Sequence, residues 1–248
     1  MRATPELQIL LPVHNEAESI AATIREIYEE ISPLATVEFI LCEDGSKDNT
    51  KEVLREIAKE IPAKLLLSDA RKGYSRAVRD GMGAADAPFL LCLDSDGQCD
   101  PKDFAEFWKN RNRADVLMGW RVHRADTVLR KAMSRTFLAA WKSLYRVPIH
   151  DPSCPFMLAR NEIIRDISTT MGAMREGFWW EFTARVARGG YSIHEIPVHH
   201  RNRAAGVTQI YRLGKLPRIG YQHFLALFRI LRETRPQAQM AFSQKLRG

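Results

Sequence analysis

The sequence predicts an α/β fold in which a mostly parallel sheet is flanked by helices. Short apolar runs alternate with amphipathic stretches of about ten residues through the first hundred positions, as in parallel sheets whose strands are joined by helices. The chain has 248 residues, of which 45% are apolar. That composition suffices for one large core and excludes a disordered or collagen-like protein. Parallel sheets bind ligands at the carboxyl ends of their strands, so those ends are where we expect a site.

Each element is predicted from a local pattern of residues. Strands are assigned to compact apolar runs, and helices to stretches in which apolar residues recur every three or four positions. The predicted strands cover residues 7–11, 37–42, 63–67, 89–93, 114–120, 156–159 and 193–197. The predicted helices cover residues 20–31, 50–60, 74–82, 102–110, 128–144 and 216–233, with two more near Asn161 and Phe178.

The net charge of +7 hides an asymmetry between the two parts of the chain. Residues 1–100 carry 11 basic and 19 acidic side chains, a balance of −8, whereas residues 101–248 carry 26 and 11, a balance of +15. An acidic part favours cations, and a basic part favours anions such as nucleic acid, anionic lipid or a phosphorylated small molecule. There is no zinc-finger spacing and no aromatic RNA-binding motif, so we expect no nucleic-acid partner.

The cysteine and hydropathy patterns bear on the compartment. The four cysteines form no C-x-x-C pair, which argues against a zinc site or a disulfide framework and favours a reducing cytoplasm. No run approaches the ~20 apolar residues of a membrane-spanning helix, and no secretory signal pattern is present. We therefore expect a cytoplasmic protein in which no segment spans a bilayer.

Acidic residues follow three of the predicted strands at the point where each strand ends. Glu16 follows the first, Asp44 the second, and Asp94 and Asp96 the fourth. Because these ends share one edge of the sheet, the carboxylates can converge, and such hard oxygen ligands select Mg²⁺ or Mn²⁺. Gln98 can add a neutral carbonyl oxygen. The alternative is structural, because aspartates in this pattern also cap turns and helix starts.

Four segments of the first hundred residues resemble the family 2 glycosyltransferases in order and spacing. They are residues 10–16 (LLPVHNE), residues 43–48 (EDGSKD), Lys72-Gly73 with Ala77 and Gly81, and residues 93–98 (LDSDGQ). Within that family, the chain most resembles the polyprenyl-phosphate sugar transferases of the dolichol-phosphate mannose synthase type. The later segments that carry this resemblance are Asp151-Pro152-Ser153, Glu181, residues 195–198 (EIPV) and Arg203-x-x-Gly206. The resemblance extends over residues 7–211.

The resemblance implies a Rossmann-like GT-A fold and a metal-dependent enzyme that binds a UDP- or GDP-linked sugar. The implied catalytic domain covers residues 1–212, with a donor half (1–100) and an acceptor half (101–212), and an amphipathic helix and tail (213–248) follow. The implied donor-nucleotide residues are Pro12, His14, Glu16, Asp44, Ser46, Lys72 and Asp94. The implied ligands of Mg²⁺ or Mn²⁺ are Asp94, Asp96 and Gln98, and Asp96 is also an implied catalytic residue. The family often carries a tyrosine where His14 stands.

For the acceptor half, the resemblance implies an acceptor that carries a phosphate. The implied phosphate-binding residues are Arg121, Arg130, Ser134 and Arg203. Arg130 and Ser134 lie one helical turn apart, so their side chains can converge on one phosphate. A phosphate monoester is largely ionised near neutral pH, so it can attack the anomeric carbon without a dedicated base. In-line attack would invert the anomeric configuration.

An acceptor hydroxyl would instead require a carboxylate base, and Asp151 and Glu181 are the candidates for this catalytic role. Either is also open to a structural role, Asp151 as a loop cap and Glu181 as a partner for arginines. The alternative function is therefore a soluble family 2 transferase that acts on a glycan or a small-molecule hydroxyl. A further alternative is a non-catalytic basic module that binds lipid or nucleic acid.

The stretches 128–144 and 216–231 each combine an apolar stripe with basic residues. Such a stripe usually faces a core, but aromatic residues beside cations also suit a helix that lies in the lipid interface. We therefore expect an inverting glycosyltransferase that transfers a sugar to a polyprenyl phosphate, as a peripheral protein at the cytoplasmic face of the membrane.

Overall fold

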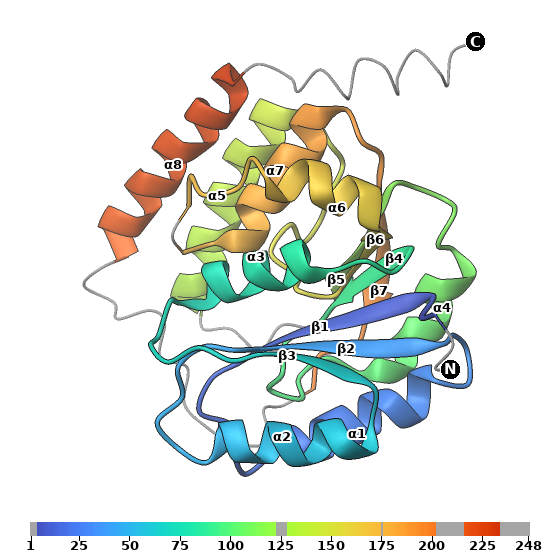
Figure 1. Cartoon of the computed structure of the whole chain (residues 1–248). Coiled ribbons are helices and arrows are strands. Elements are labelled where there is room, and N and C mark those ends of the chain that lie inside the picture. The colour runs from blue at the N-terminus through green and yellow to red at the C-terminus, as the bar shows by residue number, and fades with distance from the viewer. Residues whose placement is uncertain (1–3, 123–127, 175, 202–215, 234–248) are drawn as a thin grey trace.

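The computed structural model describes residues 4–122, 128–174, 176–201 and 216–233, with the backbone alone at 128–135 and 216–219. Within these residues, seven strands form one sheet in the order β3-β2-β1-β4-β6-β5-β7 (Figure 1). They are β1 (Leu7–Val13), β2 (Val37–Glu43), β3 (Ala63–Leu66), β4 (Phe89–Cys92), β5 (Val116–Arg121), β6 (Met157–Arg160) and β7 (Ile193–Val198). The predicted α/β class with a mostly parallel sheet is confirmed.

β6 is the strand that runs against the others. β3, β2, β1 and β4 are parallel neighbours, and β5 pairs in parallel with β7. β6 pairs antiparallel with both β4 and β5 and thereby joins the two parallel groups. Because β6 is reversed, the segment before it, rather than the one after it, reaches the edge at which the other strands end.

Helices cover both faces of the sheet (Figure 1). The first face carries α1 (Ile20–Ile31), α2 (Thr50–Glu60), the short 3-10 helix η1 (Pro101–Asp103) and α4 (Phe104–Lys109). The second carries α3 (Tyr74–Ala84), α6 (Asn161–Ser168) and α7 (Phe178–Gly189), with α5 (Val128–Tyr145) and α8 (Leu216–Arg232) packed against α7. Among the described residues, no helix has both the length and the apolar character needed to cross a membrane.

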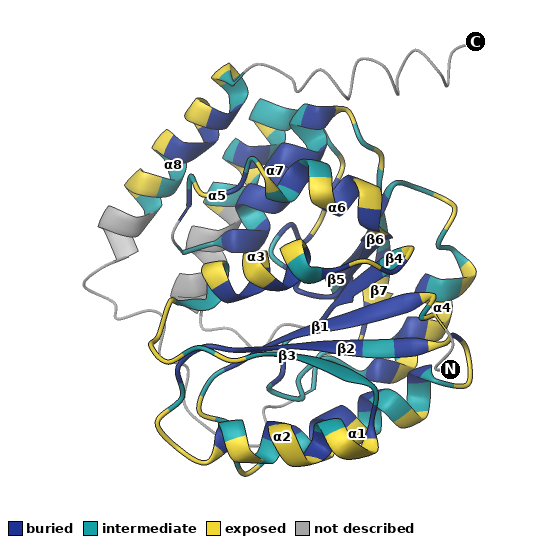
Figure 2. Ribbon diagram, viewed as in Figure 1, coloured by how far each residue is buried: buried dark blue, intermediate teal, exposed yellow. Residues whose placement is uncertain are grey.

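β1 illustrates how the sequence sets these layers. Successive side chains of a strand point to opposite faces. Ile9 and Leu11 accordingly join the apolar core beneath α1 and α2, whereas Leu10 joins the core beneath α3 and α7. All of β1 is buried, and Figure 2 shows the central strands in the colour of buried residues. Because β1 is covered on both faces, its sequence is a nearly continuous apolar run.

Both predicted halves of the chain contribute to this single sheet. β1 to β4 come from residues 1–100, and β5 to β7 from residues 101–212. The predicted boundary between residues 212 and 213 lies outside the described residues, so it stays a prediction. The carboxyl ends of β1, β2, β4, β5 and β7 meet at one edge of the sheet, together with the segment that leads into β6.

Candidate active site

Two loops at this edge are joined to each other, one after β1 and one after β2. The backbone N–H of Asn15 donates to Ser46 Oγ at 2.9 Å, and the N–H of Lys47 donates to Asn15 Oδ1 at 2.9 Å. Asn15 has a φ of 54°, a left-handed conformation that asparagine tolerates better than most residues. These reciprocal bonds fix the backbone beside His14 and Ser46, two of the predicted nucleotide-binding residues.

Asp44 is held by the loop that precedes α3. Its buried carboxylate accepts the backbone N–H groups of Lys72 at 2.5 Å and Gly73 at 2.9 Å. The two loops approach so closely that a Cβ on Gly45, whose φ is +63°, would lie 2.4 Å from the carbonyl carbon of Ala70. Only glycine fits there without a shift of the backbone. A carboxylate oxygen has more than one lone pair, so Asp44 can also accept from a ligand.

The remaining donor-side residues differ in their hydrogen bonds and ion pairs. Lys72 Nζ pairs with Asp80 on α3, and this hydrogen bond raises the pKa of Lys72 above its usual value. The backbone N–H of Glu16 donates to Thr50 Oγ1 at 2.9 Å. His14 Nδ1 is buried and makes no hydrogen bond to the described residues. A buried polar atom in that state is one that a bound ligand can satisfy.

The turn after β4 carries the two aspartates. The Ser95 hydroxyl donates to the Pro12 carbonyl at 2.7 Å and so anchors the turn to the end of β1. Asp96 Oδ1 accepts the N–H of Gln98 at 3.1 Å, which is an Asx-type turn. The turn-capping role considered for this motif is therefore present. Asp94 lies two residues earlier on the same turn.

The residues on this turn fit a divalent cation that is completed by a ligand. Gln98 Nε2 donates to the Arg201 carbonyl at 3.3 Å, which leaves the side-chain carbonyl oxygen for a cation. No cluster of three or more His, Cys, Asp or Glu side chains suited to a metal is found in the described part of the chain. Asp94 and Asp96 supply two carboxylates, and Mg²⁺ typically uses one or two together with phosphate oxygens and waters. The donor set therefore suits a cation bound jointly with a diphosphate.

The segment after β7 runs beside this turn. The backbone N–H of Arg201 donates to the Gln98 carbonyl at 2.9 Å, and the Arg201 guanidinium pairs with Asp100 at 2.7 Å. Arg201, the last described residue of this segment, therefore lies beside the turn that carries the aspartates. Three of the predicted phosphate-binding side chains lie outside the described residues, namely those of Arg130, Ser134 and Arg203.

Arg121 and Asp151 form an ion pair between the end of β5 and the loop before β6. Arg121 Nε lies 2.7 Å from Asp151 Oδ2, and Nη2 lies 3.0 Å from Oδ1. Ser153 accepts from Arg121 Nη2 at 2.9 Å and donates to Asp151 at 2.8 Å. Burial by itself would lower the pKa of Arg121, but the charge of Asp151 raises it above the usual value. Glu195 on β7 holds the loop by accepting the Asp151 N–H at 2.9 Å.

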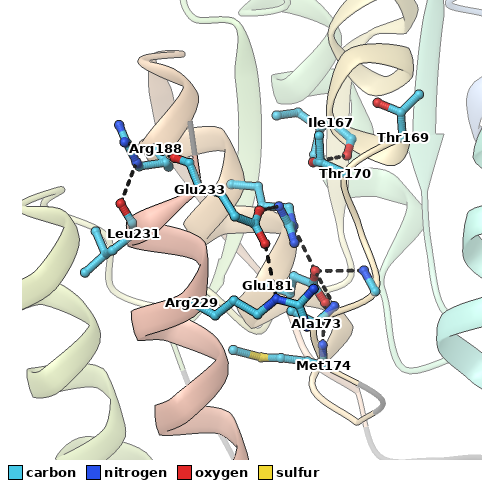
Figure 3. A network of polar contacts seen from close by, with 12 residues as sticks. Ile167, Thr169, Thr170, Ala173, Met174, Glu181, Arg188, Arg229, Leu231 and Glu233 are labelled. Carbon is cyan, nitrogen blue, oxygen red and sulfur yellow. Dashed lines mark hydrogen bonds and ion pairs between the residues drawn. The ribbon is translucent and has the colours of Figure 1, made fainter. Parts of the chain in front are cut away.

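Glu181, in the first turn of α7, lies at the centre of a buried polar network (Figure 3). Its oxygens accept the consecutive N–H groups of residues 172–174 at 2.8, 2.9 and 2.7 Å, and Arg185 Nε lies 2.8 Å away. Arg185 Nη1 in turn lies 2.6 Å from Glu233, just after α8. These contacts correspond to the structural role considered for Glu181, as a partner for an arginine.

Comparison with known proteins assigns the chain to a family. The model of the family "Glycosyl transferase family 2" matches residues 8–175, more than half of the chain. The chain belongs to glycosyl transferase family 2. It is 27% identical over 209 residues to the dolichyl-phosphate hexose transferase of Haloferax volcanii, covering 83% of this chain and 86% of that protein. It is also 27% identical over 237 residues to the dodecaprenyl-phosphate galacturonate synthase of Rhizobium johnstonii, covering 93% and 69%.

Solved structures of glucosyl-3-phosphoglycerate synthase from Mycobacterium tuberculosis share the fold of this family 2 glycosyltransferase. The complex with Mn²⁺, UDP-glucose and phosphoglyceric acid has a TM-score of 0.65 at 18% identity, over 92% of this chain and 80% of that chain. The complex with Mg²⁺ and UDP has a TM-score of 0.66 at 19% identity, over 92% and 79%. The predicted GT-A fold is confirmed.

Two further residues contact the candidate site and have no signal in the sequence. Tyr74, the first residue of α3, donates its hydroxyl to Asp94 Oδ1 at 2.7 Å. Trp179, 105 positions later on α7, donates its indole N–H to the Tyr74 oxygen at 2.8 Å. An aromatic residue at a helix start is usually interpreted as a core residue, and the pairing is too distant along the chain to leave a local pattern.

The structure brings the described candidate residues together at one edge of the sheet, with the exception of Glu181. Along the ends of β1, β2 and β4, and in the loop before α3, lie the donor-side and metal-side residues, namely Pro12, His14, Glu16, Asp44, Ser46, Lys72, Asp94, Asp96 and Gln98. Arg121 and Asp151 lie at the same edge, at the end of β5 and before β6. Glu181 belongs to α7, and its oxygens face the backbone of residues 172–174.

Proposed function

We propose that this glycosyltransferase moves a sugar from a nucleoside diphosphate donor to the phosphate of a polyprenyl phosphate, with inversion. The observation that carries the acceptor class is the engagement of both candidate bases. Asp151 is paired with Arg121, and Glu181 accepts three backbone N–H groups and Arg185. Taking up a proton would break those contacts, so neither carboxylate suits the deprotonation of a hydroxyl. An ionised phosphate needs no base.

The donor half supports binding of the nucleotide. The Asp44 carboxylate, fixed by two backbone N–H groups, can accept from a base edge, and His14 Nδ1 offers an unsatisfied polar atom at the end of the neighbouring strand. The loop bonds between Asn15 and Ser46 hold these groups in place before the donor arrives. Such preorganisation lowers the entropy lost on binding.

Asp94 and Asp96, with Gln98, are the residues that would hold Mg²⁺ or Mn²⁺ against the diphosphate. When bound, the cation supplies positive charge to the leaving nucleoside diphosphate. In the reaction, an acceptor phosphate oxygen bonds to the anomeric carbon while the bond from that carbon to the diphosphate oxygen breaks. The departing nucleoside diphosphate keeps the electron pair, so no proton has to be moved.

Arg121 supports the binding of the acceptor phosphate. Its Nε and Nη2 groups face Asp151 and Ser153, whereas Nη1 has no hydrogen bond to the described residues. Asp151 thus orients the guanidinium and leaves one end of it for a phosphate oxygen. The proposed partners of Arg121 are Arg130, Ser134 and Arg203. The names of the two relatives, a dolichyl-phosphate and a dodecaprenyl-phosphate enzyme, support the acceptor class.

A surface on α8 supports contact with a membrane. Tyr221, Leu225 and Phe228 are 67%, 52% and 47% exposed. Arg229 and Arg232 lie beside them. Large apolar side chains flanked by cations suit the interface of an anionic bilayer. We place the enzyme as a peripheral protein at the cytoplasmic face, where both the nucleotide sugar and the lipid phosphate are within reach.

The experiment is transfer of radiolabelled sugar from UDP- and GDP-linked donors, with Mn²⁺, to a polyprenyl phosphate in detergent micelles. We expect label in the organic extract, and none when the matched polyprenol without phosphate replaces the acceptor. Label confined to a water-soluble product when a soluble extract is supplied would contradict the proposal. That outcome would support a small phosphorylated acceptor, such as the phosphoglyceric acid bound to the mycobacterial synthase.

A further inference from the structure

Trp179, Tyr74 and Asp94 form a chain of two hydrogen bonds whose direction is fixed by chemistry. The indole N–H of Trp179 can only donate, so the Tyr74 oxygen must accept at 2.8 Å. A phenol has a single proton, and Asp94 Oδ1 lies 2.7 Å from the same oxygen. The proton of Tyr74 is therefore directed at Asp94.

The groups that make this chain are held firmly. The Tyr74 ring packs edge-on against Phe178, with 6.4 Å between centroids and 76° between planes. Trp179 is 6% exposed and follows Phe178 at the start of α7. The approach to α7 is fixed by Glu181, which accepts the N–H groups of residues 172–174. The indole N–H therefore has little freedom to turn away from Tyr74.

α8 closes over the same helix start. Gly177, which precedes α7, has a φ of +92°, and a Cβ there would lie 2.8 Å from the ring of His223 on α8. The approach to α7 is thus bound at residues 172–174 by Glu181 and covered at Gly177 by His223. Trp179 lies at this helix start, and through Tyr74 it connects α7 of the acceptor half to Asp94 of the donor half.

We propose that Tyr74 is a positioning residue that orients the Asp94 carboxylate toward a divalent cation, and that Trp179 fixes the direction of the Tyr74 hydroxyl. This inference rests on the proposed function, in which Asp94 and Asp96 hold the metal. A carboxylate is free to rotate about its side-chain bonds unless an outer hydrogen bond stops it, and ligating carboxylates are generally held in this way. Because a carboxylate has about four lone pairs, Asp94 can accept from Tyr74 and still ligate a cation.

The test compares Tyr74→Phe with Tyr191→Phe. Tyr191 is a matched control, because its hydroxyl also donates to an aspartate, Asp166, at 2.7 Å, but joins the segment after α7 to α6. The measurement is the Kd of Mn²⁺ in the presence of saturating UDP or GDP, from the electron paramagnetic resonance signal of free Mn²⁺. We expect Tyr74→Phe to weaken Mn²⁺ binding by about 10-fold or more, and Tyr191→Phe to leave it unchanged.

Urea unfolding without metal supplies the structural comparison. Tyr191→Phe removes the hydrogen bond to Asp166, whereas Tyr74→Phe removes the bond to Asp94 and also leaves the Trp179 indole N–H without its acceptor. We therefore expect the larger loss of stability in Tyr74→Phe, and a loss of Mn²⁺ affinity in the folded protein in that variant alone. An unchanged Kd in Tyr74→Phe, or an equal loss in Tyr191→Phe, would overturn the role of Tyr74. Trp179→Phe should weaken Mn²⁺ binding less than Tyr74→Phe, and wild-type affinity there would overturn the role of Trp179. If the wild-type protein binds no Mn²⁺ with either nucleotide, the metal site of the proposed function fails as well.

Discussion

Arg121 and Asp151 are joined by two parallel contacts, with 12% of one side chain and 5% of the other exposed. The pair links the end of β5 to the loop before β6, so it ties together two strands that the antiparallel pairing brings side by side. A planar guanidinium matches a carboxylate in this fork geometry, which an ammonium group cannot reproduce. This geometry supports the proposed role of Asp151 in orienting Arg121 over the alternative role as a base.

Arg121→Ala should destabilise the protein by about 3–5 kcal/mol, because it leaves the buried Asp151 carboxylate unpaired with its arginine. Replacing both residues, as Arg121→Met with Asp151→Leu, should recover much of that stability, since a buried ion pair can be exchanged for packed apolar groups. Use of a polyprenyl phosphate should stay impaired in the double variant. Urea unfolding and the KM for the acceptor measure the two effects. Recovery of both stability and acceptor use would remove Arg121 from the phosphate site.

Glu181→Gln and Asp96→Asn should have opposite effects: the first should lower stability and spare turnover, and the second should spare stability and abolish turnover. Glu181 is 1% exposed and accepts from three N–H groups and Arg185, so a glutamine amide would face donors and leave the arginine without this partner. We expect a loss of about 3–5 kcal/mol in stability and near-normal turnover per folded molecule. Asp96→Asn should leave thermal stability nearly unchanged and abolish turnover. If instead Glu181→Gln stayed fully folded and inactive, Glu181 would be restored as a catalytic base.

Gly45→Ala should destabilise the loop after β2, because Gly45 has a φ of +63° and its Cβ would meet the backbone of Ala70 at 2.4 Å. A strained backbone position of this kind costs about 1–3 kcal/mol. Gly83→Ala is the control, since a Cβ on Gly83 in α3 has nothing within 4 Å. That substitution should stabilise the helix by about 1 kcal/mol. Chemical denaturation of both variants checks the difference in sign, and nucleotide affinity should fall only in Gly45→Ala.

The central strands, and the sheet edge that carries the candidate donor-side residues, could be predicted because each is marked by a short local pattern in the sequence. β1 and β4 lie in the core and are apolar runs in the sequence, and the polar residues that follow them mark the edge where strands end. The turn with Asp94 and Asp96 lies directly after β4, as predicted from the apolar run that precedes it. Local order along the chain is sufficient to predict these elements.

Direction and pairing could not be predicted in the same way. β6 has four residues, and nothing in so short a run indicates that it lies antiparallel between β4 and β5. The sequence indicates Arg121 and Asp151 only as separate site residues, because their contact depends on that reversal of β6. The link from Trp179 through Tyr74 to Asp94 arises only when α3 and α7 pack on the same face of the sheet.

The contributions of His223 and His199 to the free energy of unfolding should depend on pH in opposite directions. Burial lowers the pKa of His223 below its ordinary value of 6.5, so its contribution is present above pH 6.5 and is lost as the pH falls through the folded-state pKa. The hydrogen bond to Asp103 raises the pKa of His199 above 6.5, so its contribution is present below pH 6.5 and is lost as the pH rises through the higher value. Imidazole titrations by NMR should place the two pKa values on either side of 6.5.

The matched variants extend this prediction to the free energy of unfolding. His223→Gln should flatten the pH dependence below pH 6.5, and His199→Gln should alter it only above that value. Because His223 lies over Gly177 at the start of α7, acid should also loosen the packing of α8. A pKa of His223 above 6.5 would contradict the burial that the packing of α8 on α7 implies.

Leu225→Glu combined with Phe228→Glu should weaken sedimentation of the protein with vesicles that contain anionic lipid. Both residues are exposed on α8 beside Arg229 and Arg232, so neither substitution opens a cavity in the core. Full transfer of a large apolar side chain out of water is worth about 1.5–3 kcal/mol, and each of these side chains is about half exposed, so losing both contacts should lower binding by at least ~10-fold. Leu34→Glu is the control, because Leu34 is similarly exposed but lies between α1 and β2. Wild-type binding by the double α8 variant would move the membrane contact to another surface.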